Sequence, residues 1–453
     1  MTKKAFKRAL LCGRGECMRA VREEPETFRA LVLWGCTHAF AYDAQSEGSR
    51  GWYFASLIAA YADPTPFVET LEQAFMGTLV QDEWKFQHYA ELLAALAEGG
   101  NRQAKAILIE KYRLLYAHLD TRKRRPQSLN SDLLFCMEQL CCALAPVLHC
   151  DGTADLAADI GRLMRTHSYM DALDFEWFYT HACNLYRRRT FLAILKNRAK
   201  TDPDTAYFLE QMCAADEQPH QRPDLYSDLP QTAEEALAAL SKGQWLPLYL
   251  VRSWLKAGKT EECCRLAEAA LAAPDIKIQC TLLHQFGIHA PFPLSPLPLL
   301  PLARSDHEGL RDAVIARLSE ATHPEIRRLA LELAQETDRE ADAVLLLSRN
   351  FQPEDTGVLR ELLRRLPTNQ DNGWHGAYSA VLDMFGHGSP VRAPREFLSF
   401  LYENQRCSCC REDVLKQMSR RRMVTRDLLE ACRFDCNADI RLWAERKLKS
   451  FQK

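Results

Sequence analysis

A short phrase occurs twice near the C-terminal end of the chain. Residues 323–330 (HPEIRRLA) and 437–444 (NADIRLWA) share a turn-forming start, then Ile-Arg, then an Ala four residues after the Ile. Leu333 and Leu448 continue the same helical face beyond the two copies. A repeated helix of this kind cannot bury its apolar face alone, so it must stack on neighbouring helices. The phrase therefore predicts an all-α fold, an α-solenoid of stacked antiparallel helical hairpins.

Helical periodicity extends through almost every segment of the chain. In residues 323–336 the apolar side chains recur at i, i+3, i+4, i+7 and i+8, which places them on one stripe of a helix. Turn signals such as 63–66 and 151–153 recur at intervals that suit helical hairpins. We expect about twenty helices on this basis. The stripe in 323–336 is formed by Ile326, Leu329, Ala330, Leu333 and Ala334.

Three phrases carry a resemblance to a known family. Ile-Arg-x-x-Ala at 326–330 and 440–444, with a degenerate Cys-Arg-x-x-Val at 410–414 between them, resembles the second helix of HEAT repeats. The offset of 114 from Ile326 to Ile440 suits about three units of the roughly 40-residue HEAT period. The middle copy does not fall on an even third, so we expect insertions. The chain resembles bacterial-type HEAT-repeat proteins, which implies an interaction scaffold and supplies no catalytic residues.

Two proline-containing stretches divide the chain. Residues 218–230 contain three prolines, which exclude a regular helix. Residues 291–301 contain five prolines in eleven residues, which force an extended path whose Leu and Phe side chains can pack on a neighbouring surface. The sequence predicts four parts: an irregular helical-repeat region (1–217), helical hairpins after a Pro-containing loop (218–290), a Pro-rich linker (291–301) and C-terminal HEAT-like repeats (302–453).

Composition and charge limit the classes of partner. Of the 453 residues, 47% are hydrophobic and 26% charged, enough for a continuous core and a solvated surface. The formal net charge of -2 gives no general attraction to phosphates or to an anionic bilayer. The apolar stretch near the N-terminus is too short for a signal peptide, and no later run reaches about 18 uninterrupted apolar residues. We therefore expect a cytoplasmic protein with no membrane partner.

The 17 cysteines favour reduced, buried thiols over a disulfide framework, because their number is odd and many take apolar positions of helical patterns.

One group of cysteines could bind a metal ion. Cys407 and Cys410 have two residues between them, as in a zinc knuckle, and Cys432 and Cys436 form a looser pair. Because Cys410 takes the Ile position of the repeat phrase, we prefer helix packing and keep zinc as the alternative. We expect no cofactor.

Residues 34–53 are the densest polar stretch and the best candidate for a binding site. They connect two apolar helical segments, so their polar side chains lie on a loop between packed elements. Carboxylates beside a His and an Arg can perform acid–base chemistry or bind a charged ligand. The structural alternative, which we favour, is that Asp43 or Ser46 caps the next helix, Glu47 pairs with Arg50 and the tryptophans fill the core. The candidate residues are Trp34, His38, Asp43, Gln45, Glu47, Arg50 and Trp52.

A second candidate lies at 171–179, where Asp174 and Trp177 belong to an acidic and aromatic segment. Acidic residues in a first helical turn and the arginines at 187–189 near its end suit the helix dipole, which explains the pattern without a ligand. The functional alternative is a surface that grips a peptide or a flipped base. The other basic runs, 122–125 and 420–422, are expected on solvated loops or helix ends.

The leading hypothesis is a non-enzymatic helical-repeat scaffold that binds a protein or peptide on its concave surface. The arginines after Ile326 and Ile440 are expected to join ladders between adjacent helices rather than to contact the partner. The alternative is a nucleic-acid-binding protein or a DNA-repair glycosylase of the HEAT-like type, which needs a basic concave face, and the near-neutral charge disfavours it. A tetrapyrrole or small-molecule lyase would rest on fold analogy alone. The sequence has no phosphate-binding Gly-rich loop, HExxH or Gly-x-Ser-x-Gly.

Overall fold

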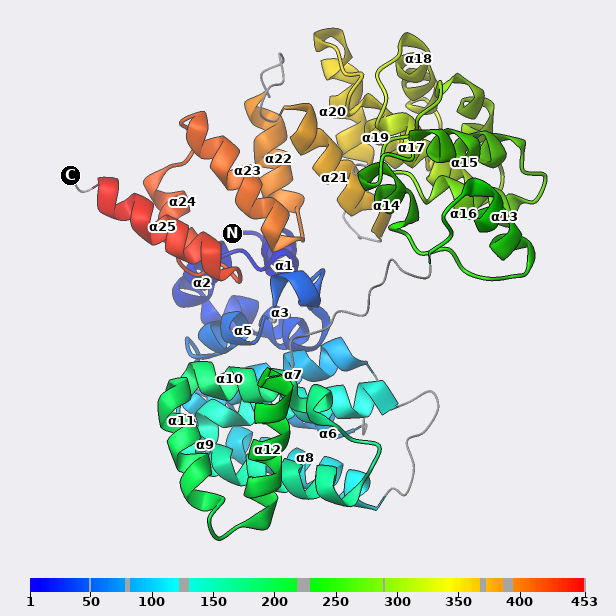
Figure 1. The fold of residues 1–453 in the computed structure, drawn as a ribbon. Coiled ribbons are helices and arrows are strands. Elements are labelled where there is room, and N and C mark those ends of the chain that lie inside the picture. The colour runs from blue at the N-terminus through cyan, green and yellow to red at the C-terminus, as the bar shows by residue number, and fades with distance from the viewer. Residues whose placement is uncertain are drawn as a thin grey trace. The chain divides into compact units, whose positions relative to one another are not determined.

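The structure, a computed structural model, describes residues 1–48, 50–77, 82–121, 130–217, 229–287, 290–366, 372–385 and 394–451. Over these residues the chain forms 25 α-helices, four short 3-10 helices and no strand (Figure 1). The prediction of an all-α fold is therefore confirmed. The basic run 122–125 and most of the Pro-containing stretch 218–230 lie outside the described residues.

The chain divides into two compact units. Unit 1 comprises Met1–His220 and Glu403–Lys453, and unit 2 comprises Gln221–Tyr402. The segments at the two ends of the sequence thus belong to the same unit, and the Pro-rich stretch 291–301 lies inside unit 2. The four-part division of the sequence stays a prediction.

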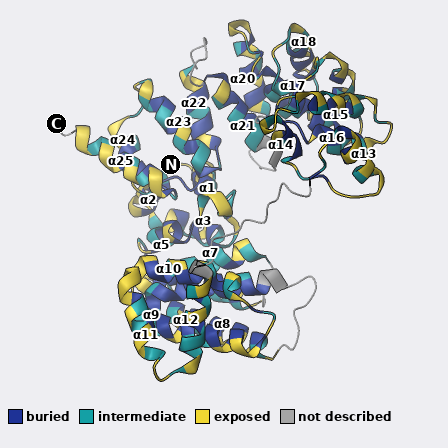
Figure 2. Cartoon of the chain, in the orientation of Figure 1, coloured by how far each residue is buried: buried dark blue, intermediate teal, exposed yellow. Residues whose placement is uncertain are grey.

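Unit 1 joins the first twelve α-helices to the last three. Its core centres on the long α9, against which α7, α8, α10, α11 and α12 pack. Figure 2 shows that the buried residues of these helices lie mainly on the faces turned toward one another. The elements are α1 (Lys3–Cys12), α2 (Glu16–Glu23), α3 (Pro25–His38), α4 (Ala44–Glu47), α5 (Gly51–Ile58), α6 (Thr65–Met76), α7 (Glu83–Glu98), α8 (Arg102–Asp120), α9 (Asn130–Thr166), η1 (Ala172–Phe175), α10 (Glu176–Tyr186), α11 (Arg188–Arg198), α12 (Pro203–Glu217), α23 (Ser408–Arg420), α24 (Arg426–Cys432) and α25 (Ala438–Phe451).

In unit 2 the helices are stacked so that a helix contacts the second helix along the chain as well as its immediate neighbour. Within it, α19 packs against α17 and α21 as well as against α18 and α20. Ile326, Leu329, Ala330 and Leu333 are all buried, so the stripe predicted for the first copy of the repeat phrase is confirmed. The elements are α13 (Ala233–Ser241), α14 (Leu250–Lys256), α15 (Thr260–Ala272), α16 (Ile276–Leu283), η2 (Leu297–Leu299), η3 (Pro301–Arg304), α17 (Glu308–Ser319), α18 (Pro324–Leu333), α19 (Glu340–Leu347), η4 (Pro353–Asp355), α20 (Thr356–Arg365), α21 (Asn372–Met384) and α22 (Arg395–Asn404), which ends just past the unit boundary.

The Pro-rich stretch 291–301 differs from the extended path expected for it. It contains η2 and runs into η3, each with proline in its first turn. Proline fixes φ near the value that a 3-10 turn needs, and the first turn needs no N–H donor, so closely spaced prolines permit such turns. The expected packing is present: Leu299 is fully buried, and the Phe292 ring lies 5.1 Å from that of Phe286.

The long α9 is also strongly apolar. Among the described residues, Leu133–Thr166 is the helix long and apolar enough to cross a membrane, with a mean hydropathy of 1.6 in its most apolar window. Of that window 67% is buried inside the protein, as it is in the core helix of a globular unit. His149, with φ of 58°, interrupts the helical backbone within this span.

A buried histidine in α7 makes the stability of unit 1 depend on pH. His88 is 2% exposed, its Nε2 lies 3.1 Å from the carbonyl oxygen of Cys36, and the rings of Phe40 and Phe54 meet it edge-on. Burial lowers the pKa of His88 to about 4. In the unfolded chain the pKa is about 6.5. Between these two values the unfolded chain binds a proton at this histidine that the folded chain does not, so the contribution of His88 to stability falls as the pH falls.

We expect the wild-type protein to lose about 2 kcal/mol of unfolding free energy through His88 between pH 7 and pH 5, an upper estimate from the two pKa values. His88→Gln keeps an N–H donor and removes this titration. Urea denaturation of both proteins at the two pH values measures the difference. An equal loss in the variant would show that His88 is not the group responsible.

Candidate functional site

The loop 39–50 is held by its own capping bonds and by the C-terminal segment of unit 1. Asp43 caps α4, because its Oδ1 accepts the N–H groups of Gln45 and Ser46 at 3.1 and 3.2 Å. Glu47 accepts the N–H of Asp43 at 2.9 Å with one oxygen and the N–H of Ser408, the first residue of α23, at 2.8 Å with the other. Asp43 is therefore a helix cap, but of the short α4 rather than of the following apolar helix, α5, which begins after Arg50 without a side-chain cap. Glu47 also caps a helix that follows 361 residues later.

Arg50 connects three segments of unit 1. Its side chain is 1% exposed, and its guanidinium donates to the carbonyl oxygens of Leu11 at 2.6 Å and Arg406 at 3.2 Å. The same group lies 3.9 Å from the carboxylate of Glu47, so the predicted pair forms as a long contact. The stronger interactions of Arg50 are with backbone carbonyls. Arg50 therefore acts mainly as a buried link between the end of α1, the loop and the start of α23.

The two candidate tryptophans each pack against a cationic side chain and do not line one pocket together. Trp34 packs partly on the core, its ring stacks on that of His38 at 5.1 Å, and Lys7 Nζ lies 4.2 Å from its centroid. Trp52 is 46% exposed, and the Arg441 guanidinium lies 4.1 Å above its ring. The expectation that the tryptophans fill the core is therefore wrong for Trp52. Stacking with Arg441 accounts for its exposed face. Gln45 is exposed.

A fully buried ion pair lies next to this loop in unit 1, and the sequence alone did not reveal it. Arg411 and Asp435 have side chains with 0% exposure and approach to 2.8 Å. The Arg411 guanidinium also donates to the carbonyl oxygen of Gln405 at 3.2 Å, and Asp435 accepts the N–H of Asn437 at 3.0 Å. The one sequence signal is that Arg411 holds the Arg position of the degenerate Cys-Arg-x-x-Val phrase. Its partner cannot be inferred from that position.

Two glycines allow the N-terminal and C-terminal segments to approach closely. Gly13 has φ of 68°, and a Cβ built there would lie 2.3 Å from the Sγ of Cys436. The N–H of Cys436 donates to the carbonyl oxygen of Gly13 at 2.8 Å. A Cβ on Gly15 would lie 1.8 Å from the carbonyl oxygen of Ala431, where α2 packs on α24 (Figure 1). The backbones of the two segments are therefore in direct contact.

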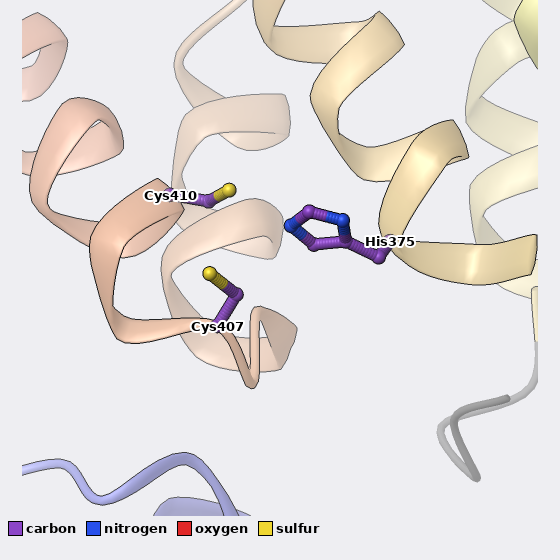
Figure 3. Close-up of side chains that lie close together, drawn as sticks. All are labelled: His375, Cys407 and Cys410. Atoms are coloured by element: carbon purple, nitrogen blue, oxygen red, sulfur yellow. The ribbon is translucent and has the colours of Figure 1, made fainter. Parts of the chain in front are cut away.

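The four cysteines considered as metal ligands separate into two places. Cys407 precedes α23 and Cys410 lies in its first turn, with their sulfur atoms within 4.8 Å of one another (Figure 3). Cys432 is buried in α24, and Cys436 contacts Arg411 at 3.5 Å. Within the described part of the chain, neither belongs to the close group of potential ligands that contains Cys407 and Cys410. His375, also drawn in Figure 3, is a residue of unit 2.

The surroundings of Cys12 and Cys436 keep these two thiols protonated. Burial raises the pKa of Cys12 although four arginines around it, Arg411 foremost, act in the opposite direction. Burial and the Asp435 carboxylate raise the pKa of Cys436 to about 11. Thiolate, not thiol, is the nucleophile, so these two groups are inert at neutral pH. The arrangement of charges suits a packed junction better than a reaction centre.

The second candidate segment lies against α9 and α12. Asp174 completes a capping box, since its Oδ2 accepts the N–H of Asp171 at 3.0 Å while Asp171 accepts that of Leu173. Trp177 is 67% exposed. Glu138, which no sequence signal pointed to, accepts the N–H of Phe178 at 3.1 Å, and burial raises its pKa to about 7. The segment thus presents an exposed tryptophan on α10, directly after the capped turn η1.

A surface pocket of about 360 Å³ lies where α2 and α24 meet. Its charges are mixed, and one of its arginines, Arg22, stacks on Phe434 at 4.6 Å. A pocket lined by both positive and negative side chains does not favour an anionic ligand over a cationic one. The lining residues are Gly15, Arg19, Arg22, Glu23, Asp427, Glu430, Ala431, Arg433 and Phe434.

Comparisons with known proteins add little to this geometry. No family model matches the chain, and no curated protein matches it. Among solved structures, a crystal structure of an engineered protein aligns over 89% of this chain and 94% of its own, with 13% sequence identity and a TM-score of 0.25. A likeness that weak carries no argument about fold or function.

Proposed function

We propose that this chain is a HEAT-like helical-repeat protein, an α-solenoid that acts in the cytoplasm as a non-enzymatic scaffold and binds a protein or peptide partner on its concave surface. The observation that carries the proposal is the stacking in unit 2, where α19 packs on both α17 and α21. These three helices begin at Glu308, Glu340 and Asn372, at intervals of 32 residues, which is shorter than the roughly 40-residue HEAT period expected from the sequence. Contact between every second helix at a regular interval is what a solenoid requires.

Polar bonds between neighbouring hairpins support the same proposal. Arg327, the arginine of the first repeat phrase, binds both carboxylate oxygens of Asp355 at 3.0 and 2.6 Å. Asn350 donates to the carbonyl oxygen of Ala321 at 2.9 Å and accepts the N–H of His323 at 2.9 Å. These bonds join residues 27 to 29 positions apart. Arg327 thus makes the ladder expected of it, and this leaves other side chains to meet a partner.

The side chains best suited to meet a partner are exposed tryptophans. Trp245 is 72% exposed and Leu248 64% exposed on the loop between α13 and α14, and the exposed cations Lys242 and Arg252 lie three and four positions before and after them in the sequence. Tryptophan is enriched among the residues that dominate protein interfaces. An apolar side chain flanked by acidic residues in a partner peptide would suit this surface of unit 2.

The test is affinity capture with the full chain from nuclease-treated lysate of its native organism, followed by affinity measurement with the purified partner. We expect a protein partner whose affinity falls at least tenfold in Trp245→Ala, the effect of losing an interface anchor. Leu114→Ala, which removes a 47% exposed side chain of α8, is the control and should not change affinity. Recovery of no protein, together with a salt-sensitive gel shift of duplex DNA, would contradict the scaffold and favour the nucleic-acid alternative.

A further inference from the structure

The start of α23 places two thiols on one face of a helical turn. Cys407 is the N-cap residue, with φ of -63° and ψ of 116°, and Cys410 follows three positions later. Residues three apart in a helical turn are neighbours, and the two sulfur atoms lie within 4.8 Å of each other (Figure 3). A disulfide needs sulfur atoms about 2.05 Å apart and Cα atoms about 4.4–6.8 Å apart. Side-chain rotation within this turn can supply the remaining approach.

The two thiols differ in access. Cys407 is 6% exposed, whereas Cys410 is partly exposed, as is Cys409 between them. Cys409 is turned toward the loop, because its sulfur donates to the carbonyl oxygen of Ser46 at 3.7 Å. A small reagent can therefore reach Cys410 first, with Cys407 behind it as the thiol that completes the reaction.

We propose that Cys407 and Cys410 form a reversible dithiol–disulfide site that reacts with low-molecular-weight disulfides. The Cys410 thiolate attacks a disulfide RSSR, forms a mixed disulfide and releases RS⁻. The Cys407 thiolate then attacks the Cys410 sulfur, forms the Cys407–Cys410 bond and releases the second RS⁻. The two thiol protons end on the two leaving thiolates. The protein loses two electrons and RSSR gains them, giving two RSH.

The surroundings of the turn favour a disulfide that is difficult to reduce over one that readily oxidises other thiols. Free N–H groups at a helix N-terminus stabilise a thiolate and make a disulfide there easier to reduce. Here the N–H of Ser408 is taken by the Glu47 carboxylate at 2.8 Å. This donor is therefore not available to stabilise a thiolate in the turn, so the disulfide should be harder to reduce than one at a helix N-terminus whose N–H groups are free.

Trypsin makes the test direct, because cleavage after Arg406 and Arg411 releases the peptide 407–411, CSCCR. The folded full-length chain is incubated with oxidised glutathione, then denatured, alkylated with iodoacetamide and digested. We expect this peptide to carry one alkyl group and to lack two hydrogen atoms. The same protein kept reduced should carry three alkyl groups. A glutathione adduct without an internal disulfide would overturn the proposal.

Single substitutions identify the pair. Cys409→Ser should retain the internal disulfide. Cys407→Ser should yield a glutathione mixed disulfide at Cys410, whereas Cys410→Ser, which leaves only the buried Cys407 of the pair, should yield no glutathione adduct at Cys407. Loss of the internal disulfide in Cys409→Ser would overturn the assignment. Stoichiometric zinc in the purified wild-type chain, with the peptide oxidised only after a chelator removes the metal, would also overturn it and assign the thiols to a metal site.

Discussion

Replacing Arg411 with methionine is expected to lower the free energy of unfolding by about 3–5 kcal/mol, because the substitution leaves a buried carboxylate without its charged partner. Both side chains of the Arg411–Asp435 pair have 0% exposure, and the second carboxylate oxygen of Asp435 has no hydrogen-bond partner among the residues that the structure describes. Urea denaturation followed by circular dichroism measures the loss. Adding Asp435→Asn to Arg411→Met removes the unpaired charge, so the double variant should be more stable than the single one.

A matched control is the exposed pair Arg165–Asp204, which joins α9 to α12 in the same unit at 2.6 Å. Arg165→Met should cost less than about 1 kcal/mol, as surface ion pairs usually do. If Arg411→Met cost no more than Arg165→Met, the ion pair would not be buried as described.

Replacing Gly15 with alanine is expected to lower the free energy of unfolding by about 3 kcal/mol, the upper range for overpacking. The backbone of Gly15 is helical, with φ of -69° and ψ of -13°, so alanine causes no backbone strain there. At a glycine whose new Cβ meets no other atom, the same change would stabilise the protein by about 0.4–1 kcal/mol, because alanine reduces the conformational entropy of the unfolded chain. The new Cβ would instead meet backbone atoms, 1.8 Å from the Ala431 oxygen and 3.0 Å from the Asp435 nitrogen.

Gly357→Ala is the control for this prediction. Gly357 lies in α20, and among the described residues a Cβ there would come within 4 Å of no atom apart from its chain neighbours and the backbone of its own helix. Its substitution should leave the stability unchanged or raise it slightly. A neutral or stabilising effect of Gly15→Ala would mean that α2 and α24 do not approach as closely as the structure shows.

Local features of the sequence predicted the helices and several of their ends. The buried stripe of Ile326, Leu329, Ala330 and Leu333 follows from periodicity alone, because one face of an isolated helix must find cover. The cap at Asp43 follows from a side chain that bonds its own backbone two and three residues on. In both cases the pattern that carries the prediction lies within one or two helical turns of the sequence.

The polar contacts of Glu47 and Arg50 in unit 1 could not be predicted, because the residues that they bond to are distant in sequence. Glu47 bonds to Ser408 and Arg50 to Arg406, contacts that span 361 and 356 residues. Periodicity locates the face of a helix and says nothing about which helix covers it. The same limit explains why Glu47 and Arg50 looked like candidates for a ligand site. Their polar groups are engaged by the other end of the chain.

Hydrogen exchange tests most directly the central claim that residues 403–453 pack into the same unit as the N-terminal helices. In the wild-type chain, the N–H groups of Ser408 and Cys436, bonded to Glu47 and Gly13, should exchange slowly. In Gly15→Ala, exchange should accelerate at Cys436 and along α24 as well as along α2. Acceleration confined to α2, with residues 426–441 unchanged, would contradict the claim.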